Sequence, residues 1–232
     1  MALIDSHSPS VVFGYWDVRG LGQPIRLLLE HVSEKYEDKL YVCGDGPDYD
    51  RSCWLDEKFN LGLDFPNLPY IIDGSVKIVQ SGAIMRYLGR KHDLCEEGNG
   101  PDDEIGWQRV DQLEDHAYDL RIKFARTCYS PDFEKTHQAY TDALPGEMKQ
   151  LSAFLGNRKW FVGDKLTFVD FIMYEYLDQQ LLFSPSCLDN VPTLKQYHQH
   201  FEELKNIPAY LKSNRFIKTR INNRMAFWGS GN

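Results

Sequence analysis

The sequence predicts two domains of different class, an α/β domain followed by an all-helical domain. Short β-branched and aromatic runs alternate with a helical pattern before residue 95, and no strand pattern occurs beyond residue 104. Between them, residues 96–103 contain Gly, Asn, Pro and acidic residues but no apolar side chain, which is typical of a linker. We therefore expect domains at 11–95 and 104–232, preceded by a leader at 1–10.

The composition is that of an ordinary folded protein. Hydrophobic residues make up 42% of the 232 residues and charged residues 26%, which argues against disorder and fibrous repeats. The formal net charge of −8 argues against a nucleic-acid surface. Five widely spaced cysteines without a Cys-x-x-Cys pattern predict reduced thiols and no metal site. No signal-peptide pattern or membrane-spanning run is present, so we expect a cytoplasmic protein without a membrane partner.

The first domain opens with the pattern of a βαβ unit. Val11–Trp16 is β-branched and aromatic, and predicts a strand. Apolar residues then recur at helical spacing behind Pro24, which suits the first turn of a helix. Lys39–Cys43 predicts the second strand, and we expect a buried parallel pair.

A long loop, Gly44–Asp64, separates this unit from a hairpin. Pro69–Ile72 and Val76–Val79 are short apolar runs joined by Asp73-Gly74, a strong turn signal. The loop has weak periodicity, and a loop of this length is expected to have a function.

Ser81 follows the hairpin and is predicted to cap a helix whose inward side is Ile84, Met85 and Leu88. The element order β-α-β, loop, β-β-α is that of a thioredoxin-like domain.

The second domain is marked by helical periodicity. Its first long amphipathic helix has apolar residues at Val110, Leu113, Ala117, Leu120 and Phe124. Farther along, Thr167 and Asp170 form a capping-box pattern, with Leu166 and Phe171 placed as a hydrophobic staple. We expect this motif to serve folding by fixing where one helix begins.

Six motifs together are similar to those of mu-class glutathione transferases. They are Gly14–Leu21, Pro47–Ser52, Leu63–Tyr70, Gln80–Ser81, Cys128–Lys135 and Trp160–Lys165, and the likeness runs from Val11 to about Trp228. The leader, extra residues around Gly98–Asp103 and the polar run Asn222–Arg224 depart from the family pattern. The resemblance implies a thioredoxin-like domain with a cis bond at Leu68-Pro69, and a helical domain that forms the hydrophobic substrate site.

The resemblance assigns Tyr15 as the catalytic residue, although a tyrosine in an aromatic strand is by itself usually a core residue. A thiol has a pKa of about 8.5, and lowering it by ~2 units requires about 2.7 kcal/mol of anion stabilisation. One hydrogen bond to a charged group contributes roughly 1.5–3 kcal/mol. A single phenol donor is therefore sufficient to hold glutathione as its thiolate.

Glutathione carries two carboxylates and one ammonium, so its pocket needs both cationic and anionic groups. Arg51, Trp54 and Lys58 would share one face if the long loop turned helical, with a solvated charged face as the alternative. Ser81 suits a carboxylate at a helix N-terminus, and a plain N-cap is compatible with that. The resemblance implies this glutathione-binding set: Tyr15, Trp16, Leu21, Arg51, Trp54, Lys58, Asn67, Leu68, Pro69, Gln80, Ser81, and Asp119 from a neighbouring subunit.

The resemblance also implies a homodimer and a second-substrate pocket for small hydrophobic electrophiles. Phe65 would be the aromatic key that inserts into the partner, with a buried core residue as the alternative. Tyr129 would polarise the electrophile, with an exposed helical tyrosine as the alternative. The second-substrate set is Val18, Tyr118, Arg121, Tyr129, Asn222 and Asn223. Glutathione is a co-substrate in this scheme, and no cofactor or metal is expected.

Two other functions fit the same fold. A non-catalytic carrier of hydrophobic ligands would not need the Tyr15 hydroxyl. A thiol-disulfide oxidoreductase would need a cysteine at the start of the first helix, and the stretch Tyr15–Pro24 contains none. Peroxide reduction by the bound thiolate stays open beside conjugation.

Overall fold

The computed structural model describes residues 11–95 and 104–231. The predicted leader 1–10 and linker 96–103 lie outside these ranges. The first part contains β1 (Val11–Trp16), α1 (Gln23–His31), β2 (Tyr36–Tyr41), α2 (Ser52–Leu55), β3 (Tyr70–Asp73), β4 (Val76–Val79) and α3 (Ser81–Lys91). The second part contains α4 (Glu104–Cys128), α5 (Phe133–Leu155), α6 (Phe168–Phe183), α7 (Pro192–Glu202) and α8 (Ile207–Lys212).

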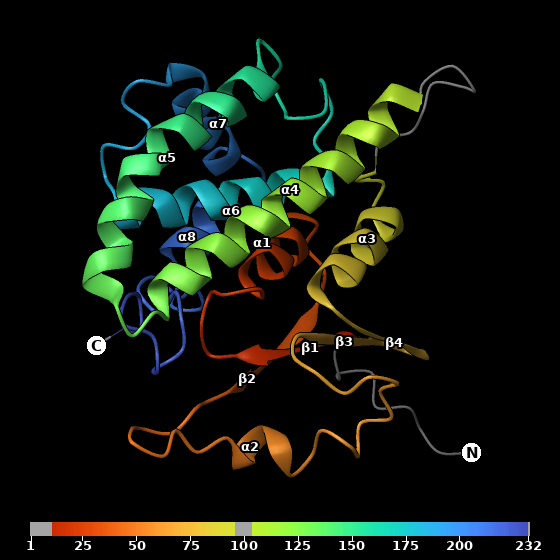
Figure 1. Ribbon diagram of the computed structural model, residues 1–232. Helices are drawn as coiled ribbons and strands as arrows, with labels where there is room; N and C mark the ends of the chain where they lie inside the picture. The colour runs from red at the N-terminus through yellow and green to blue at the C-terminus, as the bar shows by residue number, and fades with distance from the viewer. Residues whose placement is uncertain (1–10, 96–103, 232) are drawn as a thin grey trace.

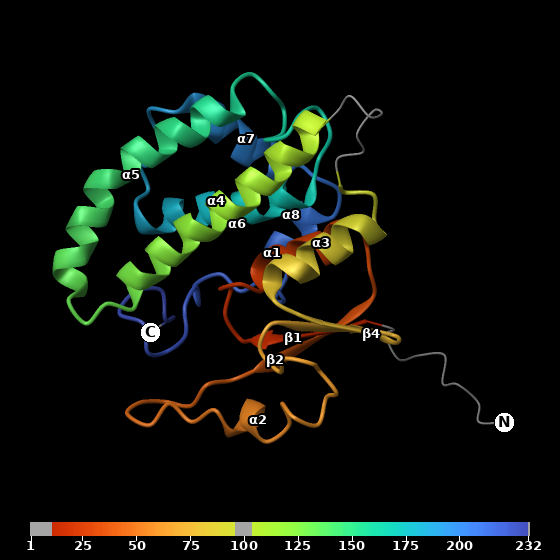
Figure 2. The same cartoon turned by 45° about the vertical axis from the view of Figure 1, so that its right-hand side comes forward.

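The sheet has the strand order β2-β1-β3-β4, with β1 parallel to β2 and antiparallel to β3. Helices α1 and α3 lie between the sheet and the helical domain, whereas α2 lies beyond the opposite face of the sheet (Figure 1 and Figure 2). The β3–β4 hairpin turns at Gly74, which has a φ of +58°, as the Asp73-Gly74 signal predicts. This architecture confirms the predicted thioredoxin-like domain followed by a helical domain.

The predicted second strand needs correction. It begins at Tyr36 rather than Lys39 and ends at Tyr41, because β1 pairs with it from Val11 opposite Tyr36 to Trp16 opposite Tyr41. The expected burial of the parallel pair is also wrong for β2. This strand lies at the sheet edge, and Leu40 remains exposed.

Two features at the start of α3 bear on the site. Gln80, rather than the predicted Ser81, is the N-cap residue, and Ser81 is the first helical residue. Gln80 has a φ of +74°, a conformation that residues other than glycine rarely adopt.

The Leu68-Pro69 bond is cis, as the resemblance implied, and Gly46-Pro47 is cis as well.

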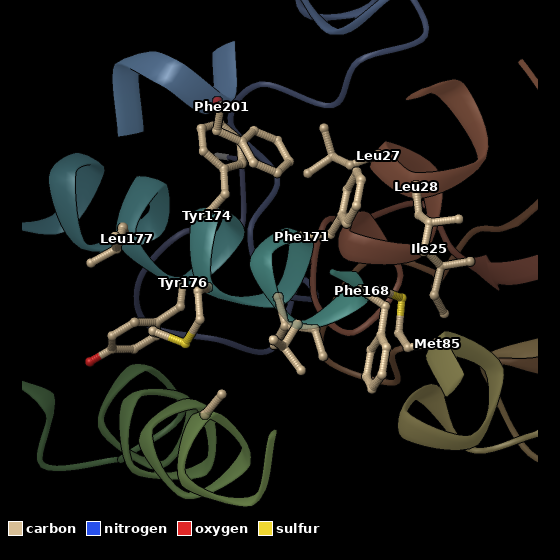
Figure 3. Packing of buried hydrophobic residues seen from close by; sticks show 14 of the residues in the cluster. Ile25, Leu27, Leu28, Met85, Phe168, Phe171, Tyr174, Tyr176, Leu177 and Phe201 are labelled. Atoms are coloured by element: carbon tan, nitrogen blue, oxygen red, sulfur yellow. The ribbon is translucent and has the colours of Figure 1, made fainter. Parts of the chain in front are cut away.

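Helix α6 is at the centre of the molecule, and most of its side chains are buried, including those of the acidic residues Asp170 and Glu175. Its side chains meet α1, α3 and α7, with Tyr174 stacked on Phe201 at a ring-centre distance of 4.0 Å (Figure 3). The predicted capping box starts this helix. Thr167 donates its N–H and hydroxyl to Asp170 Oδ2 at 2.9 and 3.0 Å, and Phe161 N–H donates to Asp170 Oδ1 at 3.1 Å.

A buried ion pair joins the two domains just after β1. Arg19 is 1% exposed and donates to both oxygens of Glu175 at 3.0 and 2.6 Å. Its Nη2 also donates to Asp178 at 2.5 Å. Because removal of one partner would leave a buried charge uncompensated, these contacts hold the loop after Tyr15 firmly against α6.

Candidate active site

Tyr15 is the penultimate residue of β1, and its phenol is enclosed by the loop that follows. The hydroxyl oxygen accepts a hydrogen bond from Leu21 N–H at 3.0 Å, and the residue is 7% exposed. A side chain at Gly20, which has a φ of +38°, would place a Cβ 2.7 Å from this hydroxyl oxygen. Glycine at this position therefore allows the backbone to close around the phenol.

Tyr15 keeps its proton at neutral pH. Burial raises the pKa of the phenol above its ordinary value, while the Leu21 N–H, the Arg121 guanidinium and Arg26 act in the opposite direction. Arg121 is fixed nearby, because its Nη2 donates to the Gly20 carbonyl at 2.5 Å. The hydroxyl is thus a neutral donor in a field that favours a neighbouring anion.

An open cleft with a volume of about 780 Å³ lies beside this phenol. Its walls come from the end of β1, the C-terminal end of α4 and the segment near residue 222. It collects most of the residues predicted for the second substrate, together with several predicted for glutathione. The predicted residues that line it are Tyr15, Trp16, Val18, Leu21, Arg51, Tyr129, Asn222 and Asn223.

Tyr129 enters this cleft directly after the last residue of α4. Its hydroxyl accepts a hydrogen bond from Asn223 N–H at 2.7 Å, which leaves its own O–H free to donate. Burial and, to a smaller extent, the negative charge of an ionised Tyr15 raise the pKa of this phenol to about 12, while the Asn223 N–H acts in the opposite direction. The two tyrosines are therefore both protonated donors in one cleft.

The structure places Tyr118 and Arg121 elsewhere. They line a smaller hollow beside Ser81, Gly82 and the buried carboxyl group of Glu114, rather than the cleft that holds Tyr129. Tyr118 lies seven residues before Ala125, which does line the cleft, and seven helical residues span about 10 Å. The prediction that Tyr118 and Arg121 line the second-substrate cleft does not match this geometry.

The predicted residues Arg51, Trp54 and Lys58 have different surroundings in the segment around α2. Trp54 is 5% exposed and stacks on Tyr70 at a ring-centre distance of 6.0 Å, so it anchors the segment to the sheet. Arg51 is exposed and lines the cleft. Lys58 follows a further turn, with its Nζ 4.9 Å from the centre of the Phe59 ring. The two cations thus extend from an anchored turn rather than from a longer helix.

Leu68 and Pro69 are buried before β3, and Asn67 beside them is exposed. Asn67 Oδ1 accepts the Leu68 N–H at 2.9 Å. Gln80 is exposed and Ser81 half-buried at the start of α3. The positive φ of Gln80 is strained for a non-glycine residue, and backbone strain of this kind is concentrated at functional sites.

Asp119 and Phe65 are both exposed in the single chain. Asp119 lines two hollows between α4 and α5, neither of which includes Gln80 or Ser81. Phe65 is 76% exposed, so the alternative of a buried core residue is wrong.

Sequence reasoning missed several lining residues of the cleft. Ala125 precedes Tyr129 by one helical turn, and that spacing could have identified it. Ile221 and Met225 flank the predicted asparagines. An ion pair between Arg224 and Asp45 joins the C-terminal segment to the loop after β2, and no local pattern indicates that pairing. None of the helices in the parts of the chain described here is long and apolar enough to cross a membrane.

A thioredoxin-like domain with a buried tyrosine facing a cleft against a helical domain defines a glutathione transferase type of protein, and comparisons with known proteins agree. The glutathione S-transferase N-terminal domain family matches residues 11–90, and the C-terminal domain family matches residues 118–214. Glutathione S-transferase Mu 4 of Mus musculus is 56% identical over 95% of this chain and 99% of its own. Glutathione S-transferase Mu 3 of Homo sapiens is 54% identical over 95% and 96%.

Solved structures give the same result. The crystal structure of the glutathione S-transferase Blo t 8 has a TM-score of 0.83 at 33% identity, covering 94% of this chain and 99% of that one. A Pi-class glutathione S-transferase of Onchocerca volvulus has a TM-score of 0.76 at 30% identity, covering 88% and 92%. The chain belongs to the glutathione S-transferase family, and its relatives place it in the Mu class.

Proposed function

We propose that this transferase adds glutathione, held as its thiolate by the Tyr15 hydroxyl, to electrophilic carbons of small hydrophobic compounds. The observation that carries the proposal is the buried Tyr15 phenol at the cleft, which burial keeps protonated. Its oxygen already accepts the Leu21 N–H, so the remaining O–H hydrogen is available to the thiolate. The Arg121 guanidinium adds a favourable field at the same place.

The glutathione pocket is proposed from groups around this phenol. Arg51 and Lys58 would receive the glycyl carboxylate, and the N-terminus of α3 at Ser81 would receive the γ-glutamyl carboxylate. The cysteinyl backbone would pair with Leu68, whose N–H is held by Asn67 Oδ1 until the ligand arrives. Trp54 supports this wall from the core side through its stacking on Tyr70.

The γ-glutamyl ammonium needs an acid, and we assign Asp119 of a second copy to it. Asp119 does not share a hollow with Ser81 in one chain, which supports a contribution across a homodimer. The exposed Phe65 ring supplies apolar surface suited to anchor that dimer. The scheme needs glutathione as co-substrate and no cofactor or metal, and we propose a cytoplasmic location for the enzyme.

The electrophile would occupy the cleft between Tyr15 and Tyr129. Val18 and Met225 supply apolar surface there, and the Tyr129 O–H can donate to an oxygen that gains charge in the transition state. The polar residue Asn222 is largely committed elsewhere, since its Nδ2 donates to the Trp228 carbonyl at 3.0 Å. The cleft therefore suits a hydrophobic compound with one polarisable oxygen.

Comparison of the wild type with Tyr15→Phe tests the proposal directly. The pH dependence of glutathione conjugation to a small chloronitrobenzene should give the wild type an apparent pKa well below about 8.5, the ordinary thiol value. Tyr15→Phe should lose both the rate and the shift, whereas Tyr118→Phe, outside the cleft, should keep both. If both the wild type and Tyr15→Phe bind glutathione and neither conjugates any of a panel of electrophiles, a carrier of hydrophobic ligands replaces the transferase.

A further inference from the structure

Cys43 and Cys53 lie at the two ends of the loop that contains Arg51. Hydrogen bonds of the residues before and after Cys43 bring the two ends of this loop together. The Gly44 N–H donates to the Asp50 carbonyl at 2.7 Å, so the loop closes directly after Cys43. The Cys53 thiol donates to the Val42 carbonyl, the residue before Cys43, at 3.2 Å. Segment 42–44 therefore lies alongside segment 50–53, with one thiol in each.

We propose that Cys43 and Cys53 are a redox modification site, at which glutathione disulfide converts the two thiols into a reversible intramolecular disulfide. A disulfide needs Cα atoms within about 4.4–6.8 Å. The two contacts place the segments that contain the cysteines side by side, and the proposal requires α2 to shift until the two Cα atoms lie within this range. The Cys53 thiol would exchange its bond to the Val42 carbonyl for the sulfur of Cys43.

The reaction follows ordinary thiol–disulfide exchange. The exposed Cys53 thiolate attacks one sulfur of glutathione disulfide, forming a mixed disulfide and releasing one glutathione thiolate. The Cys43 thiolate then attacks the Cys53 sulfur, and the second glutathione thiolate leaves. The two protein thiols are oxidised, glutathione disulfide is reduced, and the two leaving thiolates take up the protons that the protein thiols gave up.

The two thiols have complementary environments for these roles. Cys53 is exposed and accessible to the oxidant, whereas Cys43 is buried and bonded to the Tyr49 carbonyl at 3.5 Å. Burial raises the pKa of Cys43, while the guanidinium groups of Arg51 and Arg224 act against that increase. The second step should therefore be slow at neutral pH and become faster as the pH rises.

The other three cysteines lack this arrangement. Burial raises the pKa of Cys128 to about 12 and that of Cys187 to about 11, which leaves very little thiolate at neutral pH. Burial also raises the pKa of Cys95, although that side chain is only half-buried. The exchange should therefore be selective for Cys53 and Cys43.

The disulfide would change glutathione binding through Arg51, which stands two residues before Cys53 at the start of α2. This consequence rests on the proposed function of Arg51 as a carboxylate ligand. Drawing Cys53 toward Cys43 shifts the N-terminus of α2 and with it the guanidinium at the cleft. We expect the oxidised enzyme to have a KM for glutathione raised several-fold with kcat nearly unchanged.

The test treats the full-length protein with glutathione disulfide, blocks free thiols by alkylation and maps disulfides by mass spectrometry of peptides. A Cys43–Cys53 link in the wild type and in Cys187→Ser is the expected result. Cys43→Ser should instead stop at glutathione on Cys53, and Cys53→Ser should form neither product. A wild type that keeps the mixed disulfide on Cys53, or that forms no link at these positions, overturns the proposal.

Kinetics of the reduced and oxidised forms test the consequence separately. The KM for glutathione should rise on oxidation in the wild type and return after reduction, and it should stay constant in Cys53→Ser. A linked enzyme with an unchanged KM overturns the regulatory effect of the disulfide. The Arg51→Gln variant, assayed in its reduced form, distinguishes failure of this regulatory effect from failure of the proposed function of Arg51. If the KM of this variant for glutathione equals that of the wild type, the assignment of Arg51 to the glutathione site fails instead.

Discussion

Tyr15 can donate to a thiolate only while its hydroxyl keeps a proton. The residues around it keep the phenol protonated and also favour an anion beside it. Burial raises the pKa of the phenol, so the donor form persists at physiological pH. Arg121 and Arg26 nevertheless favour negative charge at the same position. In the proposed complex that negative charge would be the glutathione thiolate, and Arg121 would then belong to the site although its side chain lines the smaller hollow.

Arg121→Gln tests this electrostatic contribution. Loss of the guanidinium removes a charge that stabilises the thiolate, so the apparent pKa of bound glutathione should rise by about 1 unit, equivalent to about 1.4 kcal/mol. The pH profile of kcat/KM for an aryl chloride measures the shift. Arg126→Gln removes an exposed cation from the same helix and should leave the profile in place. Equal profiles for the wild type and Arg121→Gln would contradict the argument.

Tyr129 should assist only electrophiles that develop charge on oxygen. Tyr129→Phe is expected to lower kcat about tenfold for an α,β-unsaturated ketone and to leave an aryl chloride nearly unchanged. Because burial raises the pKa of Tyr129 to about 12, its assistance should not decline as the pH passes 10, where an ordinary tyrosine ionises. The ratio of wild-type to mutant kcat across alkaline pH measures both effects, and a ratio that falls near pH 10 would contradict them.

At the scale of single elements, the start of α6 depends on Asp170. Asp170→Ala would leave the buried N–H groups of Thr167 and Phe161 without their acceptor, at a cost of about 3 kcal/mol. The midpoint of urea unfolding measures the loss. Asp164→Ala removes an exposed carboxylate just before the same helix and should change stability by less than about 0.5 kcal/mol. Similar losses in the two variants would show that the capping box is unimportant.

Elements were predictable where the signal is local. The capping box, the Asp73-Gly74 hairpin and the apolar stripe of α4 all depend on spacing within a few residues, and each is confirmed. The limits of β2 were not predictable, because they depend on its register with β1. Trp54 was expected among the pocket residues, but its packing on Tyr70, sixteen positions away, depends on how the loop folds back.

At the scale of the whole molecule, the sequence predicted most of the residues that line the cleft. It did not predict which part of α4 contributes to the cleft. Tyr15, Tyr129, Asn222 and Asn223 come from three distant segments, and only the resemblance joined them in one pocket. Periodicity along α4 gives the side of the helix but not which of its turns the C-terminal segment covers. For this reason Tyr118 was predicted to line the cleft, although it lies two turns before Ala125, the α4 residue that does.

Subunit complementation tests whether Asp119 acts across a dimer. Tyr15→Phe and Asp119→Asn should each impair both sites of a homodimer, by different routes. In a mixed dimer, one site would combine both substitutions and the other would contain neither, because each site takes Tyr15 from one subunit and Asp119 from the other. Mixed dimers isolated with two different affinity tags should therefore recover about half of the wild-type kcat/KM per dimer.

The recovery separates the shared site from a site contained in one chain. If Asp119 served its own subunit, every site of the mixed dimer would carry one substitution, and its activity would equal the mean of the two impaired homodimers. Phe65→Ser provides the second control, since loss of this exposed ring should weaken the dimer and reduce activity as the protein is diluted. Recovery of half-activity that disappears when Phe65→Ser is added to both chains would require both the partner's carboxylate and the aromatic key.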